Sequence, residues 1–249
     1  MFLRRRISIA IDPCICTVQS WLRRVRITLR GVALRIQGTV FMSAETATAV
    51  DFQKKFKYHH GNLREALLAA ALDILATDGI DGLSLRSLAR ATGVTQAAPY
   101  SHFRDKDELL AAVAETGFQR LALSMAEAAT GAKGAQEKIE KLACAYARFA
   151  VDNKPLFGIM FGRELADIKR FPTLAMTAGK SYALISAALA QKAAATGEDA
   201  RFLTVAVWSL CHGLTTLIVE EKLSPAQIGA ADLDTLVKRT LGVLAPQLG

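Results

Sequence analysis

Two short helical segments joined by a tight turn constrain this chain more than any other feature of its sequence. Between residues 62 and 103, apolar residues recur at helical spacing in three stretches. Ser84 and Thr95 are residue types typical of N-caps, and Gly93 is typical of a helix end. Because only a short turn containing Gly93 separates the second stretch from the third, the pattern predicts a helix-turn-helix. The expected helices span residues 62–79, 84–93 and 95–102.

One side of the third expected helix is apolar and the other is free. Val94, Ala98 and Phe103 are spaced to pack this helix onto the first two. The opposite side can then enter a DNA major groove, which is about 12 Å wide. That side carries Thr95, Gln96, Ala97 and Tyr100.

The remainder of the chain also has a helical pattern. Only 7% of residues are aromatic and alanine is abundant, so an all-β fold is excluded. Asp105 is expected to cap a long helix, and Pro155, Pro172 and Pro225 are expected near first turns. The expected fold class is all-α, an N-terminal three-helix DNA-binding domain followed by a helical bundle. The further expected helices span residues 105–129, 134–152, 155–166, 169–195, 198–222 and 231–246.

The positive charge lies mostly at the N-terminus. Of a net charge of +8, residues 1–41 carry +7, from eight Arg and one Asp. Three interpretations remain open: translation begins at Met42, the segment is a disordered basic arm that binds phosphates, or it serves targeting or membrane association. We expect a leader over residues 1–53, a DNA-binding domain over 54–110 and a C-terminal domain over 111–249.

No arrangement of residues typical of catalysis or metal binding occurs in the C-terminal half. Motifs of serine hydrolases, phosphate-binding loops and zinc proteases are all missing from the sequence. His59 and His60 have no ligand-spaced partner, so we expect neither a metal nor a cofactor. The spacing of the four cysteines favours neither a disulfide framework nor a zinc site. Two alternatives stay open, a redox-sensing regulator that uses Cys144 and Cys211 and a helical enzyme.

Three sequence segments carry a resemblance to a known family. ALDILATDG (71–79), LSLRSLA (83–89) and GVTQAAPYSHFRDKDELL (93–110) resemble the DNA-binding domain of TetR/AcrR transcriptional regulators. Pro99 departs from the family pattern, which usually has leucine there. The resemblance implies that Thr95, Gln96 and Ala97 lie near base edges, and that Tyr100 and Lys106 contact the DNA backbone.

Other residues in this region have a DNA-binding and a structural interpretation. Tyr100 and His102 match the family's Tyr-x-His-Phe, but either could instead pack on the small core. Lys55 and Lys57 belong to a basic arm that contacts phosphates or the minor groove, or else to a solvated leader. Ser84 is a candidate DNA contact as well as a cap.

The C-terminal half resembles one branch of the same family, named for its Trp, His and Gly. Trp208, His212 and Gly213 carry this resemblance, together with residues 156–161 and 170–174. Trp208 and His212 are four residues apart and so share one helix face. A ligand cavity and an ordinary apolar core both fit such residues. The candidate effector-binding residues are Phe149, Phe157, Met160, Phe161, Met176, Tyr182, Trp208 and His212.

The resemblance implies a cytoplasmic, homodimeric transcription factor. We expect a repressor that binds double-stranded operator DNA with an inverted repeat and is released by a small apolar or amphipathic effector. The dimer is expected to form through residues 198–222 and 231–246. Residues 202–219 contain no charged side chain, and a helix buried on most faces accounts for them better than a membrane span. We therefore expect no membrane association.

Overall fold

A computed structural model describes residues 63–165, 167–197 and 199–244, which are helical or irregular and include no strand. This agrees with the expected all-α fold class. Residue 62, where the first expected helix begins, lies outside the described residues. The α-helices are α2 (Leu63–Gly82), α3 (Leu85–Thr92), α4 (Lys106–Ala128), α5 (Ala135–Asp152), α6 (Lys154–Phe161), α7 (Pro172–Thr196), α8 (Ala200–Val219) and α9 (Leu233–Leu241). Short 3₁₀ helices lie between and after them, among them η1 (Ala98–Ser101) and η4 (Pro225–Ile228).

The caps predicted at the two ends of the second helix are present. The Ser84 hydroxyl accepts a hydrogen bond from the backbone N–H of Ser87, and the Ser87 side chain accepts one from the Ser84 N–H. Gly93 adopts φ +70° and ends α3. Gly79 adopts φ +71°, so the regular part of α2 ends there and a further turn continues to Gly82. These local hydrogen bonds fix how α3 leaves α2 and how the turn to η1 begins.

The third element differs from the prediction. It is not an α-helix over residues 95–102 capped by Thr95, but a four-residue 3₁₀ helix that follows a turn. Pro99 lacks an N–H and therefore cannot make the α-helical bond to the Thr95 carbonyl. The chain instead closes i to i+3 bonds, in which the N–H of Ala98 donates to Thr95 and that of Tyr100 to Ala97.

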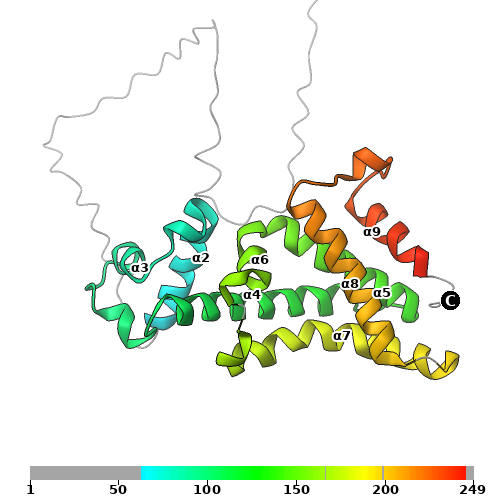
Figure 1. Cartoon of the computed structure of the whole chain (residues 1–249), viewed down its shortest axis with the longest axis horizontal. Coiled ribbons are helices and arrows are strands. Elements are labelled where there is room, and N and C mark those ends of the chain that lie inside the picture. The colour runs from blue at the N-terminus through cyan, green and yellow to red at the C-terminus, as the bar shows by residue number, and fades with distance from the viewer. Residues whose placement is uncertain (1–62, 166, 198, 245–249) are drawn as a thin grey trace, which may run out of the picture. The chain divides into compact units, whose positions relative to one another are not determined.

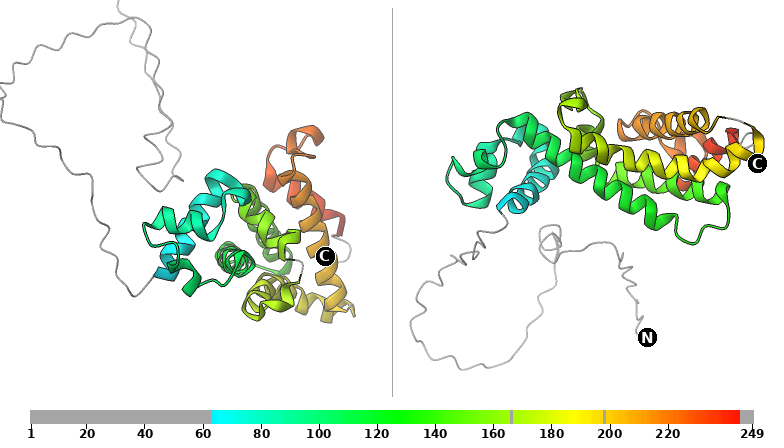
Figure 2. Two further views of the ribbon diagram at one scale, coloured as in Figure 1. Left: turned by 60° about the vertical axis from the view of Figure 1, so that its left-hand side comes forward. Right: turned by 90° about the horizontal axis from the view of Figure 1, so that it is seen from below.

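The long helix α4 connects the helix-turn-helix to the rest of the described chain (Figure 1). Asp105 caps it by accepting from the Glu108 N–H, and Asp107 and Glu108 lie in its first turn, as predicted. Beyond its first turns, α4 packs against α5, α6 and α7. Figure 2 shows α4, α5 and α7 extending away from the helix-turn-helix.

A close contact between α4 and α6 depends on a missing side chain. A Cβ at Gly117 would lie 2.5 Å from Sδ of Met160 and 3.1 Å from Cδ1 of Leu156. Glycine therefore lets α6 approach the middle of α4. The helix α6 is also shorter than predicted, ending at Phe161 rather than near residue 166.

The helix α8 is less buried than predicted. The expectation that residues 202–219 are buried on most faces is wrong for the single chain, because the exposed positions recur at helical spacing. By length and composition alone, Ala200–Val219 is apolar enough to cross a membrane. The exposed stripe on α8 consists of Phe202, Val205, Ala206, Ser209, Gly213 and Leu217.

Candidate nucleic-acid interface and aromatic core

The residues before and within η1 form an exposed surface anchored by buried neighbours. Thr95, Gln96 and Ala97 are exposed, and Tyr100 keeps 51% of its surface accessible. Pro99 is buried and Phe103 is 1% exposed. The buried pair holds η1 on the core while the preceding turn and Tyr100 remain free. Their exposure leaves these side chains free for the DNA contact that the sequence predicts.

Other predicted DNA-contacting residues have structural partners. The Ser84 hydroxyl is engaged in the cap with Ser87, with 3.1 Å between the two oxygens. His102 is half-buried. Lys106 is exposed, and its Nζ lies 3.4 Å from the Ile80 carbonyl near the end of α2. Lys55 and Lys57 lie outside the described residues.

Two arginines that sequence reasoning missed lie beside Gln96. Arg86 and Arg90 are exposed on α3, and with Gln96 and the capping serines they line one surface hollow. Neither guanidinium forms an ion pair within the described part of the chain. Their spacing of four residues on the exposed side of an amphipathic helix was a signal available in the sequence. Two unpaired guanidiniums next to an amide suit phosphates beside a base edge.

An aromatic cluster forms where α5, α6 and α8 meet. Trp208 and His212 stack with ring centroids 5.8 Å apart, so the shared face predicted from their spacing is confirmed. The His212 ring also lies 4.6 Å from that of Phe161 and 5.8 Å from that of Phe157. On the outer side, Tyr182 of α7 meets Trp208 edge-on at 6.2 Å.

The polar group at the centre of the cluster was not predicted. The Tyr146 hydroxyl lies 2.7 Å from Nδ1 of His212 and links α5 to α8. Burial raises the pKa of Tyr146 and lowers the pKa of His212, because it disfavours the charged form of each. Both side chains are therefore neutral at pH 7. A neutral hydrogen-bonded pair among aromatic rings can bind a polar group on an otherwise apolar molecule.

The other candidate effector residues are divided between core and surface. Phe149 and Met160 are buried. Met176 is 67% exposed, so its assignment to a cavity is wrong. Leu174 and Thr177 of α7 face the core, and the helical repeat turns Met176 away from it. Gly213, which carries the family resemblance with Trp208 and His212, lies on the exposed stripe of α8, where an added Cβ would meet no atom within 4 Å.

The thiols that a redox sensor would use are buried, and burial favours their protonated form. Burial raises the pKa of Cys144 to about 11 and that of Cys211 to about 12. Since the thiolate is the reactive form, neither thiol is activated at neutral pH. The described residues also contain no group of His, Cys, Asp or Glu side chains that could hold a metal ion.

Thr95, Gln96, Ala97 and Tyr100 form an exposed surface, which we call the DNA-reading segment. This segment, a capped helix-turn-helix and a separate helical core are the features of a DNA-binding transcription regulator. Residues 67–113 match the family described as bacterial regulatory proteins, tetR family, and residues 139–244 match a tetracyclin repressor-like C-terminal domain. The chain belongs to the TetR family.

Individual proteins show how far this likeness extends. The uncharacterized HTH-type transcriptional regulator YobS of Bacillus subtilis is 27% identical over 65% of this chain and 81% of its own length. The tetracycline repressor protein class A of Escherichia coli is 53% identical over 20% of this chain and 23% of its own. A Rhodococcus sp. RHA1 protein of unknown function has a solved structure that is 35% identical, with a TM-score of 0.65 over 76% of this chain and 96% of that one.

Proposed function

We propose that this protein is a repressor that binds an inverted-repeat operator as a homodimer and is released by a small apolar or amphipathic molecule. The observation that carries the proposal is the exposed segment from Thr95 to Tyr100 beside the hollow formed by Arg86 and Arg90. TetR-family regulators generally lack enzymatic activity and reside in the cytoplasm, and we extend both properties to this protein.

Each exposed side chain has a distinct role in DNA binding. Gln96 reads a base, since its amide can both donate to and accept from adenine. Tyr100 and Lys106 bind the DNA backbone, and Arg86 and Arg90, which share a hollow with Gln96, bind phosphates beside the base that Gln96 reads. The interaction of Lys106 with Ile80 orients the ammonium group before DNA is bound. Ser84 acts through its cap on α3 rather than through direct contact.

The proposed dimer forms through α8 and the segment that follows it, within residues 198–222 and 231–246. Phe202 is 75% exposed and Val205 is 47% exposed on the stripe of α8. Val243, which follows α9, is 75% exposed. Exposed apolar surface of this extent favours a protein interface. A twofold dimer also places two reading segments on one operator, about 34–36 Å apart.

The proposed effector site is the aromatic cluster. Its rings supply apolar contacts, and Tyr146 with His212 supplies one polar group on α5 and α8. A solved structure with the same fold, 15% identical and with a TM-score of 0.58 over 73% of this chain and 97% of that one, is the transcriptional regulator FadR of Bacillus subtilis in complex with stearoyl-CoA. We extend from it only the class of an amphipathic molecule with a long apolar part.

Selection of bound duplexes from randomised DNA, with the oligomeric state measured by analytical ultracentrifugation, tests the proposed function. We expect enriched sequences to contain an inverted repeat and the protein to bind them as a dimer. Recovery of random sequences, or specific binding by a monomer, would contradict the proposal.

A further inference from the structure

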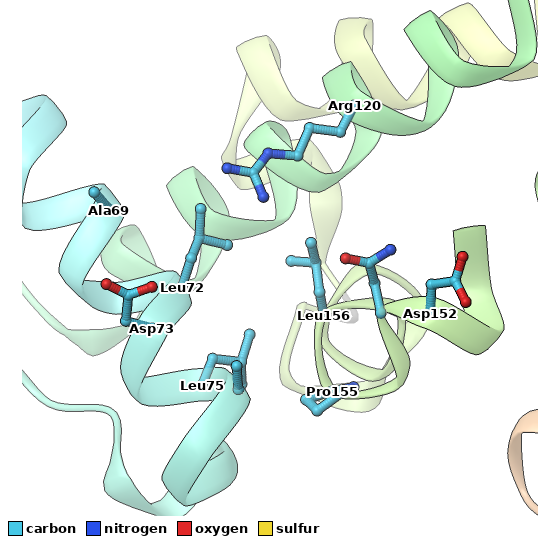
Figure 3. Close-up of a pocket in the computed structure, with 10 residues that line it drawn as sticks. Ala69, Leu72, Asp73, Leu75, Arg120, Asp152, Pro155 and Leu156 are labelled. Carbon is cyan, nitrogen blue, oxygen red and sulfur yellow. The ribbon is translucent and has the colours of Figure 1, made fainter. Parts of the chain in front are cut away.

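A crevice separates the helix-turn-helix from the helices behind it. It has a volume of about 320 Å³ and lies beside the contact between α2 and α6 (Figure 3). Its walls come from three parts of the chain that meet there. They are Ala69, Leu72, Asp73, Leu75 and Ala76 of α2, Arg120 of α4, and Asp152, Asn153, Pro155 and Leu156 around the start of α6.

Charged side chains on the crevice walls are left without partners. Arg120, Asp73 and Asp152 form no ion pair or side-chain hydrogen bond with any described residue. Ion pairs do connect other parts of the described chain, as between Lys154 of α6 and Glu221 in the turn after α8, at 2.8 Å. The charges around the crevice are thus available for a contact that the present arrangement does not make.

The geometry places Arg120 and Asp73 on opposite sides of the joint. In Figure 3 the guanidinium of Arg120 reaches from α4 toward α2, while the carboxylate of Asp73 extends from α2 at the same opening. Both side chains are exposed. Asp152 lies on the far wall, which belongs to the same group of helices as Arg120. Among the charged residues that line this crevice, Asp73 alone belongs to α2, so its pair with Arg120 would connect the two sides.

Movement of α2 would carry the DNA-reading segment with it. The helix α2 packs against α3, and α3 packs against η1. Leu67, Leu88 and Phe103 are each at most 1% exposed in the core that they share. The helix-turn-helix therefore tilts as a unit. Closing the crevice then changes the distance between Gln96 of one protomer and Gln96 of its partner in a dimer.

We propose that Arg120 is a positioning residue that pairs with Asp73 when the helix-turn-helix closes onto α6, and that this pair sets the separation of the two reading segments on DNA. The inference rests on the dimeric DNA binding proposed above. The crevice supplies the space for the movement, and Leu72 on its α2 wall, which is only half-buried, becomes better buried on closure.

The test uses operators obtained by selection with the unaltered protein, and versions whose half-site spacing is one base pair longer or shorter. We expect Asp73→Asn and Arg120→Gln each to lower affinity for the selected spacing about two- to fivefold, as expected for loss of an exposed pair. Affinity for one altered spacing should fall less. The exchange Asp73→Arg with Arg120→Asp should restore both the affinity and the preference.

Controls separate this role from general effects. Asp152→Asn removes the same charge from the other wall and should leave the spacing preference unchanged, and Arg120→Lys should retain much of it. Equal effects from Asp152→Asn, or an exchange that restores nothing, would overturn the proposal while leaving DNA binding intact. If the unaltered protein selects no inverted repeat, the proposed function fails and this inference fails with it. Thermal midpoints within the parent's range confirm that each variant is folded.

Discussion

The hydroxyl of Tyr146 and Nδ1 of His212 lie 2.7 Å apart and join two helices across a core of aromatic rings. When His212 is neutral with its proton on Nε2, Nδ1 accepts from the phenol. A proton on Nδ1 would remove that acceptor. The direction of the hydrogen bond therefore depends on the protonation of His212, because a protonated Nδ1 can only donate to the phenol oxygen, and this leads to the first prediction.

Stability should decrease as the solution is acidified through the ordinary range of histidine. The pKa of His212 is lowered by burial, so the folded state binds fewer protons than the unfolded state, whose histidine pKa is about 6.5. This contribution is complete above about pH 6.5 and is lost as pH falls from there toward the folded pKa. Chemical denaturation at a series of pH values measures it. In His212→Asn, which keeps an acceptor near Nδ1, the same pH range should show a smaller slope; an identical slope would contradict the assignment.

Replacing Gly117 with alanine should destabilise the protein by about 1–3 kcal/mol, as overpacking typically does. The new Cβ would lie 2.5 Å from Sδ of Met160. Gly158→Ala on α6 is the matched control, since a Cβ there meets no atom within 4 Å, and helix propensity alone predicts a gain of up to about 1 kcal/mol. Thermal denaturation of both variants checks the prediction. Equal stability of the two would show that α4 and α6 do not approach this closely.

Lys106→Ala should weaken binding to operator and random DNA alike. Loss of one phosphate contact lowers the slope of log affinity against log salt by about one unit. Fluorescence anisotropy at several salt concentrations measures this slope for both kinds of DNA. If the slope does not change, Lys106 does not bind the backbone.

Gln96→Ala should instead affect sequence preference. Loss of a bidentate contact to adenine costs about 1–3 kcal/mol at the operator and leaves binding to random DNA nearly unchanged. Selection from randomised duplexes should show relaxed preference at one position in each half-site. Recovery of the parent motif would rule out Gln96 as a base-reading residue.

Val205→Glu should convert the dimer to a monomer. Val205 is 47% exposed in the single chain, so the fold should tolerate the charge, whereas an interface would bury it unpaired. Leu123→Glu is the control, because Leu123 is 63% exposed and belongs to α4, outside the segments proposed for the interface. Sedimentation at several concentrations distinguishes the two. A Val205→Glu protein that remains dimeric would place the interface elsewhere.

The parts of the structure that could be predicted from the sequence are those fixed by near neighbours. Ser84, Gly93 and Asp105 act on backbone groups within about one helical turn, so residue type and spacing were sufficient. Trp208 and His212 share a helix face for the same reason.

Other features depend on distant contacts. Tyr146 and His212 are 66 residues apart, and no local pattern indicates that their side chains meet. The exposure of Met176 depends on how α7 is rotated against its neighbours, which its own sequence does not specify. Arg86 and Arg90 carried a usable spacing signal, but their common hollow with Gln96 required the turn geometry.

The 3₁₀ geometry imposed at Pro99 limits how many base pairs of one half-site the protein can contact directly. Four residues at about 2.0 Å per residue give an element only about 8 Å long, with little more than one turn of side chains to present. We therefore expect few positions of each half-site to be specified by direct contact. The protein would then recognise an operator mainly by two short base-pair motifs at a fixed spacing. Most other base pairs of the operator could change during evolution, provided that this spacing is kept.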